Sequence, residues 1–257
     1  MNIKVDKDSL ISIITPMYNS EKFIPLCIES VLAQTYKNWE LLVVYDSGTN
    51  DSSPDIVKKY SNMDSRVKLI KVPNGKGLSL SRNYAIQKSN GRFLAFLDSD
   101  DLWLESKLEK QIYFMKQNRC ALSCHGFRRI NSDGNTIGRK ISVPYNITYK
   151  RLLQQNCLGC LTVMIDLDKT GKIQFIETKH EDFILWLRLL REGHKCLGIN
   201  EDLGRYRIVE NSRSADKFES VKNTWRIYRE FEGLSLPHAA LRLSQFSIRN
   251  LIKYSRF

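Results

Sequence analysis

The chain has 257 residues, of which 42% are hydrophobic, and a formal net charge of +12. This length allows one large α/β domain or two small ones. No stretch approaches the roughly 20 apolar residues of a membrane span, and the charged residues 1–8 do not fit a signal peptide, so we expect a globular cytoplasmic protein. The positive charge calls for an anionic partner such as nucleic acid, anionic lipid or a phosphorylated small molecule.

Apolar runs alternate with amphipathic segments along the first hundred residues. This pattern predicts strands at 10–15, 40–45, 67–72 and 92–97, and helices at 21–34, 53–60 and 78–89. Buried strands separated by helices are typical of an α/β fold with a Rossmann-like, mostly parallel sheet flanked by helices. Ligands bind beyond the carboxyl ends of such strands, where three polar clusters fall, at 15–19, 46–51 and 98–101.

Three carboxylates, Asp98, Asp100 and Asp101, follow the fourth predicted strand within four positions. Like charges this close repel one another, so the cluster favours a divalent cation. Mg²⁺ or Mn²⁺ suits oxygen ligands and leaves positions open for a substrate diphosphate. The alternative is a turn in which Asp100 or Asp101 caps a helix that begins near Leu102.

The six cysteines predict free and mostly buried thiols in a reducing compartment. Two pairs, Cys120 with Cys124 and Cys157 with Cys160, have spacings that a four-thiolate zinc site would also use. Both pairs lie in apolar surroundings without the glycines and polar turns of a zinc knuckle, which disfavours the zinc alternative.

The C-terminal segment from Gly233 to Phe257 contains no Asp or Glu. At 100° per residue, Arg242, Arg249, Lys253 and Arg256 fall on one helical face and apolar residues on the rest. We therefore expect residues 215–257 to form a basic amphipathic helical tail. Such a helix either lies on an anionic membrane surface or docks its apolar side on the domain.

Five ordered motifs resemble those of the family 2 glycosyltransferases, which have the GT-A nucleotide-diphospho-sugar fold. The resemblance covers about residues 10–214 and is more specific than any one motif. The similar segments are Thr15-Pro16-Met17-Tyr18-Asn19, Asp46-Ser47-Gly48-Thr49-Asn50-Asp51, Asn74-Gly75-Lys76-Gly77 with Ser81-Arg82-Asn83, Asp98-Ser99-Asp100-Asp101, and Glu181-Asp182. The resemblance implies a nucleotide-binding half at about 1–103 and an acceptor half at about 104–214.

The resemblance also implies roles for individual residues. A UDP-sugar would contact Thr15, Tyr18, Asp46, Arg82, Asp98, Ser99 and Asp100. The direct metal ligands would be Asp100 and Asp101, holding a Mn²⁺ or Mg²⁺ ion that bridges the diphosphate.

The pair Glu181-Asp182 precedes an apolar helical segment. The residues alone suggest compensation of the charge at a helix N-terminus. The resemblance instead makes Asp182 the general base that deprotonates the acceptor hydroxyl, with Glu181 and Trp186 on the acceptor side.

The expected function is therefore transfer of one sugar, with inversion, from a UDP-sugar to an undecaprenyl-diphosphate-linked saccharide in O-antigen or capsule synthesis. We expect the protein to work peripherally on the inner face of the cytoplasmic membrane, and we expect no nucleic-acid partner.

Two positions depart from the family pattern, because Tyr45 stands where an acid is common and Val209 where His is common. The absence of a Gln-x-x-Arg-Trp motif argues against a processive synthase.

Three other functions stay open at this point. A nucleotidyltransferase would also use paired acids, but it would have a Gly-rich basic loop after the first strand, which residues 16–20 do not provide. A nucleic-acid-binding module would account for the charge, yet the aromatic residues are not interleaved with a basic stripe. A non-catalytic relative is disfavoured because the acids of all the motifs are present together.

Overall fold

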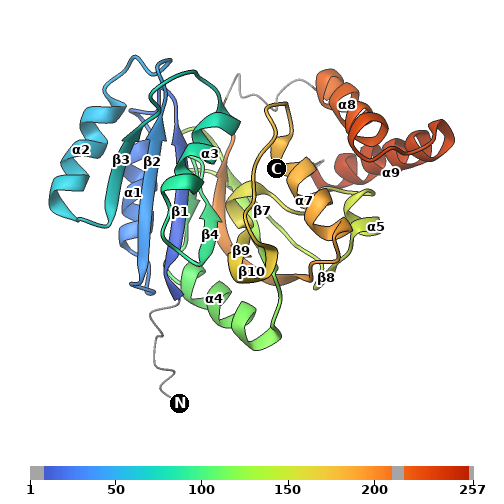
Figure 1. The fold of residues 1–257 in the computed structure, drawn as a ribbon, viewed down its shortest axis with the longest axis horizontal. Helices are drawn as coiled ribbons and strands as arrows, with labels where there is room; N and C mark the ends of the chain where they lie inside the picture. The colour runs from blue at the N-terminus through green and yellow to red at the C-terminus, as the bar shows by residue number, and fades with distance from the viewer. Residues whose placement is uncertain (1–8, 210–216, 255–257) are drawn as a thin grey trace.

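The computed structural model describes residues 9–209 and 217–254, with side chains placed for 9–209 and 219–249. Four parallel strands form one side of the sheet, in the order β3-β2-β1-β4. These strands are β1 (Ile11–Met17), β2 (Trp39–Tyr45), β3 (Val67–Lys71) and β4 (Phe93–Phe96). The helices between them are α1 (Ile24–Leu32), α2 (Ser53–Met63) and α3 (Leu78–Lys88). The expected α/β fold is confirmed, with each of these seven elements at its expected place (Figure 1).

The other half of the chain extends the same sheet. The short strand β9 (Met164–Asp166) lies antiparallel between β4 and β6 (Leu122–Ile130). Beside β6 runs β10 (Cys196–Arg207) in the parallel direction. Three further strands complete the edge, namely β5 (Leu102–Trp103), β7 (Ile137–Ile141) and β8 (Asn146–Ile147). The expected division into a nucleotide-binding half and an acceptor half stays a prediction.

Both faces of the parallel strands are buried. In β1, Ile13 belongs to one hydrophobic cluster and Ile14 to the other, because successive side chains of a strand point to opposite faces. Helices α1 and α4 (Lys107–Asn118) cover the face of Ile13, and α3 and α7 (Glu181–Arg191) cover the face of Ile14. The short helices are α5 (Tyr149–Leu152), α6 (Leu167–Thr170) and a 3₁₀ turn at Cys160–Thr162.

The predicted C-terminal tail is helical but consists of more than one segment. Helix α8 (Lys217–Arg226) continues into a π-helical stretch at Ile227–Phe231, and α9 (Leu236–Tyr254) follows (Figure 1). One side of the tail packs on the domain, where the ring of Phe246 lies 5.7 Å from that of Phe183 in α7. Tyr228 is fully buried and its hydroxyl donates to the carbonyl of Leu153. Arg256 lies outside the described residues.

The cysteines are free thiols, and five of the six are buried. Within the described stretches, no group of three or more His, Cys, Asp and Glu side chains could hold a metal ion, so the zinc alternative finds no support. In those same stretches no helix is both long enough and apolar enough to cross a bilayer.

His125 on β6 is buried away from solvent, and its ring nitrogen Nδ1 lies 2.8 Å from the carbonyl oxygen of Gly126. Burial and the neighbouring Lys107 ammonium lower the pKa of His125 to about 3. In the unfolded chain the imidazole therefore binds a proton below about pH 6.5, whereas in the folded chain it stays neutral down to about pH 3.

We predict that this imidazole makes the fold sensitive to acid. Between about pH 6.5 and 3 the free energy of unfolding should fall by about 1.4 kcal/mol per pH unit from this group. In urea titrations, the stability deficit of His125→Gln relative to the unmodified chain should shrink by about 2–3 kcal/mol between pH 7 and pH 4.5. The exposed His238→Gln serves as a control, and a deficit that stays constant with pH would contradict the prediction.

Candidate active site

The loops that follow β1 and β2 meet at Asp46 and Tyr18. The carboxylate of Asp46 is nearly buried and accepts the backbone N–H groups of Gly48 at 2.8 Å and Gly77 at 2.7 Å. The ring of Tyr18 is 63% exposed and lies so close to Gly48 that a Cβ there would stand 3.0 Å from the Tyr18 ring. Asp46 therefore fastens its own loop to the loop that precedes α3, beside the exposed ring of Tyr18.

Thr15 and Ser99, both expected at the nucleotide, lie beneath this loop. Ser99 Oγ is 2.7 Å from Ser20 Oγ, and the Ser20 hydroxyl donates to the Tyr18 carbonyl. Thr15 is completely buried, and its hydroxyl has no hydrogen-bond partner within the described part of the chain. The expectation that Thr15 contacts the nucleotide is wrong for this structure, because a side chain with no exposed surface supports the pocket from below.

The three carboxylates of the acidic turn after β4 differ in how far they are buried. Asp101 is 1% exposed and accepts the backbone N–H of Arg207 at 2.8 Å, while the Arg207 Nε–H donates to the Asp100 carbonyl. Burial and the two neighbouring acids raise the pKa of Asp101. The expectation that Asp101 is a direct metal ligand is therefore corrected, since its carboxylate faces the protein and fixes the turn.

The residues after the turn do not begin a helix. Leu102 and Trp103 form β5, which pairs with β10, and the next helix starts at Lys107. The alternative of a helix cap at Asp100 or Asp101 is thus wrong.

Asp98 and Asp100 keep partly exposed carboxylates at the open side of the turn. Burial and the negative charge of Asp98 raise the pKa of Asp100 to about 6. The raised pKa means that the charged form of Asp100 is destabilised, and a nearby cation would stabilise it. The pair Asp98 and Asp100 therefore fits a divalent metal ion. Because the described residues hold no three-ligand group, the donor phosphates would have to complete the coordination.

Arg82 on α3 connects the acidic turn to α7. Its guanidinium donates to Asp98 at 2.7 Å and to Glu181 at 2.6 Å, and it lies 5.4 Å from the centre of the Phe175 ring. Only 2% of the Arg82 side chain is exposed. The expected contact of Arg82 with the nucleotide is not what the structure shows, because the guanidinium is enclosed between the two carboxylates.

Asp182 follows Glu181 at the start of α7 and is partly exposed. Burial and the charge of Glu181 raise the pKa of Asp182 to about 6, although Arg82 opposes the shift. Glu181 itself is 5% exposed and paired with Arg82, so compensation of the helix charge alone does not account for this pair.

Trp186, expected on the acceptor side, lies in the core. It has no exposed surface and packs 5.9 Å from the Phe96 ring and 6.3 Å from the Phe175 ring. The prediction that Trp186 contacts a sugar is wrong for this structure, because Phe96 and Phe175 enclose its ring and leave none of it exposed.

Sequence reasoning missed two residues of this centre. The partly exposed thiol of Cys160 lies close to Arg82, Asp98 and Asp182, and burial raises its pKa. Asn83 fastens the segment before α7, exchanging two 2.8 Å hydrogen bonds with the backbone of Phe175. Asn83 stood within a recognised motif, but nothing in the sequence pointed to Phe175 as its partner.

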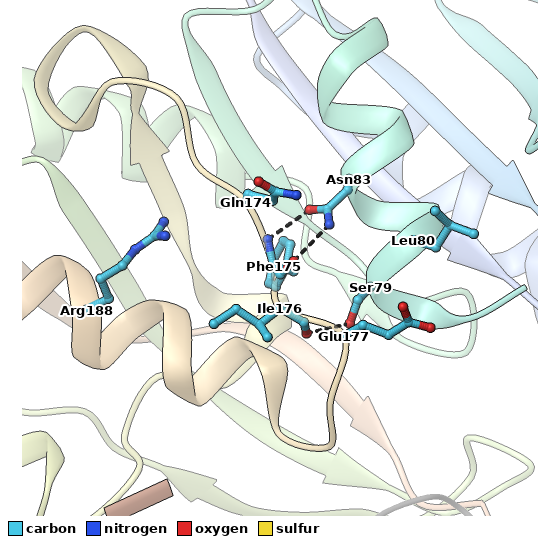
Figure 2. Close-up of a pocket in the computed structure, with 8 residues that line it drawn as sticks. All are labelled: Ser79, Leu80, Asn83, Gln174, Phe175, Ile176, Glu177 and Arg188. Atoms are coloured by element: carbon cyan, nitrogen blue, oxygen red, sulfur yellow. Dashed lines mark hydrogen bonds between the residues drawn. The ribbon is translucent and has the colours of Figure 1, made fainter. Parts of the chain in front are cut away.

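The segment that Asn83 fastens borders a surface pocket of about 420 Å³ between α3 and α7. Figure 2 shows Asn83 beside Phe175, and Ser79 with its hydroxyl donating to the Ile176 carbonyl at 3.0 Å. The lining residues are Ser79, Leu80, Asn83, Gln174, Phe175, Ile176, Glu177 and Arg188. None of them belongs to the expected nucleotide-sugar set, so this pocket lies beside the acidic centre.

Comparison with known proteins identifies the family of the chain. Residues 12–166 match the family described as glycosyl transferase family 2. A putative teichuronic acid biosynthesis glycosyltransferase, TuaG of Bacillus subtilis, is 40% identical over 95% of this chain and 96% of its own length. The Escherichia coli protein WfgD, described as a UDP-Glc:alpha-D-GlcNAc-diphosphoundecaprenol beta-1,3-glucosyltransferase, is 39% identical over 87% of each chain.

Solved structures show the same fold at low identity. The Staphylococcus aureus protein TarS in complex with UDP-GlcNAc has a TM-score of 0.70 and 21% identity, over 95% of this chain and 72% of that one. The mannosyltransferase PcManGT of Pyrobaculum calidifontis, in complex with GDP-Man and Mn²⁺, has a TM-score of 0.67 and 13% identity, over 91% and 68% of the two chains.

A GT-A glycosyltransferase fold with acids at the carboxyl ends of its strands defines the class of protein. The chain belongs to glycosyltransferase family 2.

We predict that Arg82 is required for stability. Arg82→Met should lower the free energy of unfolding by about 3–5 kcal/mol, because it leaves the buried Glu181 carboxylate without its cation. The matched control is Arg188→Met in the pocket, since Arg188 is about one-third exposed and its ion pair with Glu192 is 3.9 Å long. Guanidinium titrations of both variants test this, and equal losses in the two would contradict it.

Proposed function

We propose that this glycosyltransferase moves one sugar, with inversion, from a UDP-sugar to a hydroxyl of a lipid-diphosphate-linked saccharide during synthesis of a surface polysaccharide. The proposal is supported chiefly by Arg82, which donates to Asp98 of the acidic turn and to Glu181, the neighbour of Asp182, and by the electrostatic interaction of Asp182 with Asp98. A donor held at the acidic turn would thereby present its sugar to an acceptor next to a carboxylate base.

The donor side has the groups that a uridine diphosphate requires. The exposed Tyr18 ring offers a flat apolar face for a base, and Asp46 has acceptor capacity left beside its two backbone contacts. Proteins similar to this chain support the choice of nucleotide, since WfgD is named for UDP-Glc and TarS was solved with UDP-GlcNAc.

Asp98 and Asp100 would hold a Mn²⁺ or Mg²⁺ ion together with the donor phosphates, and Asp101 would keep the turn in place from behind. When bound, such an ion neutralises the charge that develops on the leaving diphosphate. Arg82 keeps the Asp98 side chain in a fixed position without using its own charge on the substrate.

Asp182 is suited to act as the general base. A base with a pKa near 6 is mostly ionised at neutral pH yet still accepts a proton from a hydroxyl as the bond to the sugar forms. Direct attack by the deprotonated acceptor on the anomeric carbon gives a single displacement, which inverts the configuration there.

The acceptor class is supported by the relatives and by charge. WfgD is named for an acceptor with a diphosphoundecaprenol group, and this chain carries a formal net charge of +12. A lipid-linked diphosphate at the cytoplasmic face of a membrane offers the anionic partner that such a charge favours.

The first test is calorimetric titration with UDP and with GDP, each with Mn²⁺ and then with EDTA. We expect binding of UDP in preference to GDP, and a loss of affinity of at least tenfold in EDTA or in Asp100→Asn. The exposed Asp55→Asn on α2 should bind like the unmodified chain. Tight binding of GDP but not UDP, or affinity indifferent to metal, would contradict the donor assignment.

The second test concerns the base. Asp182→Asn should lower transfer by about 10²–10⁴-fold while leaving UDP-sugar affinity within about threefold. In the unmodified chain, kcat/KM should fall as the pH drops below about 6, because the carboxylate becomes protonated. Transfer assays across pH with Asp55→Asn as the control measure this. Substantial turnover by Asp182→Asn would rule out Asp182 as the base.

A further inference from the structure

The solvent-facing side of α9 carries large apolar side chains. Leu241 is 50% exposed and Ile248 is 58% exposed. They are seven residues apart, which places them on one side of the helix. The opposite side is occupied, because Ala239 is fully buried and Phe246 packs on Phe183. The tail thus docks with one side, and Leu241 and Ile248 face solvent on the other, with the exposed Ser244 between them.

Basic side chains lie beside this open stripe. Arg249 is exposed and follows Ile248 directly, and Arg242 lies two turns earlier on nearly the same side. Between Gly233 and Phe257 there is no acidic residue that would neutralise them.

The segment that follows α5, about ninety residues earlier in the chain, contacts α9 through Gln155. The side-chain amide of Gln155 donates to the backbone carbonyl of Arg249 at 3.3 Å. The backbone N–H of Gln155 donates to the carbonyl of Arg151 at 3.2 Å, a helical spacing that puts the exposed Arg151 on the same side as Gln155. Arg151 therefore joins the surface formed by α9, and residues 145–160 contain no acid either.

We propose that Arg151, Leu241, Ile248 and Arg249, here called the α5/α9 face, bind the surface of an anionic lipid bilayer. This inference rests on the proposed function and specifies how the protein would reach a lipid-linked acceptor. Arginines contact headgroup phosphates while neighbouring Leu and Ile side chains enter the boundary of the acyl chains.

The composition of the face favours lipid over other occupants. A nucleic acid offers phosphates for the arginines but takes up exposed aliphatic side chains poorly. A second copy related by a two-fold axis would bring Arg151 and Arg249 towards the same arginines of the other copy, with like charges opposed. An anionic bilayer satisfies the charge and the apolar stripe together.

Deletion of the tail is an unsuitable test, because it would also remove the buried Tyr228 and Ala239 from the core. Point substitutions at exposed positions avoid this. The charge variant is Arg151→Gln with Arg249→Gln, and the apolar variant is Leu241→Ser with Ile248→Ser. The matched control is Lys58→Gln with Lys59→Gln, which removes two exposed charges from α2 on another part of the molecule.

The experiment is co-sedimentation of the full chain with vesicles of phosphatidylcholine alone or mixed with phosphatidylglycerol. We expect binding to the mixed vesicles only, a decrease of about 30-fold in partitioning for the charge variant, and a decrease of at least tenfold for the apolar variant. The control variant should lose clearly less than the charge variant. Equal losses in those two would indicate attraction by net charge and would overturn the assignment of the face.

Two further results would also overturn the face. One is failure of the unmodified chain to bind anionic vesicles. The other is a change from dimer to monomer, seen by light scattering, on introducing the apolar variant.

Transfer to a water-soluble, short-chain lipid-diphosphate saccharide separates this inference from the proposed function. Intact transfer without vesicle binding rejects only the face, whereas vesicle binding without any transfer rejects only the proposed function.

Discussion

The active-site architecture depends on one buried cation. Arg82 reaches from α3 to Asp98 at the end of β4 and to Glu181 at the start of α7, elements that lie far apart in the sequence. Enclosing a guanidinium is costly unless its charge is compensated, and here two carboxylates accept from Nη1 and Nη2, while Nε has no partner among the described residues. The same contacts fix the start of α7 relative to the acidic turn after β4. Asn83, the next residue, holds the intervening segment at Phe175, so one turn of α3 organises both halves.

Much of the fold could be predicted because its signal is local. Continuous apolar runs such as Leu41–Val44 identify strands buried on both faces, and Ala85 marks the packing side of α3. The second half was harder to predict. The strands β5, β8 and β9 are two or three residues long, and such short segments are defined by the neighbours with which they pair rather than by their own pattern.

The site was predictable in its residue types but less so in their roles. The motifs named Asp98, Arg82 and Asp182, which lie near one another in the structure, but they could not distinguish exposed from buried members. Asp101 turned inward because Arg207, more than one hundred residues later, offers a backbone N–H, and Trp186 is enclosed by Phe96 and Phe175. Contacts between residues this far apart in the sequence cannot be predicted from the spacing of motifs along the chain. Thr15 is a similar case, since alternation along a strand buried on both faces gives no exposed side.

The contact between Phe246 and Phe183 has a consequence for the choice of acceptor. Phe183 directly follows Asp182, so α9 is packed against the same helix that carries the proposed base. If α9 rests on lipid, the height of that carboxylate above the headgroups is set by side-chain packing and not by a linker. The enzyme would then select acceptors by how many sugars separate the lipid diphosphate from the reacting hydroxyl.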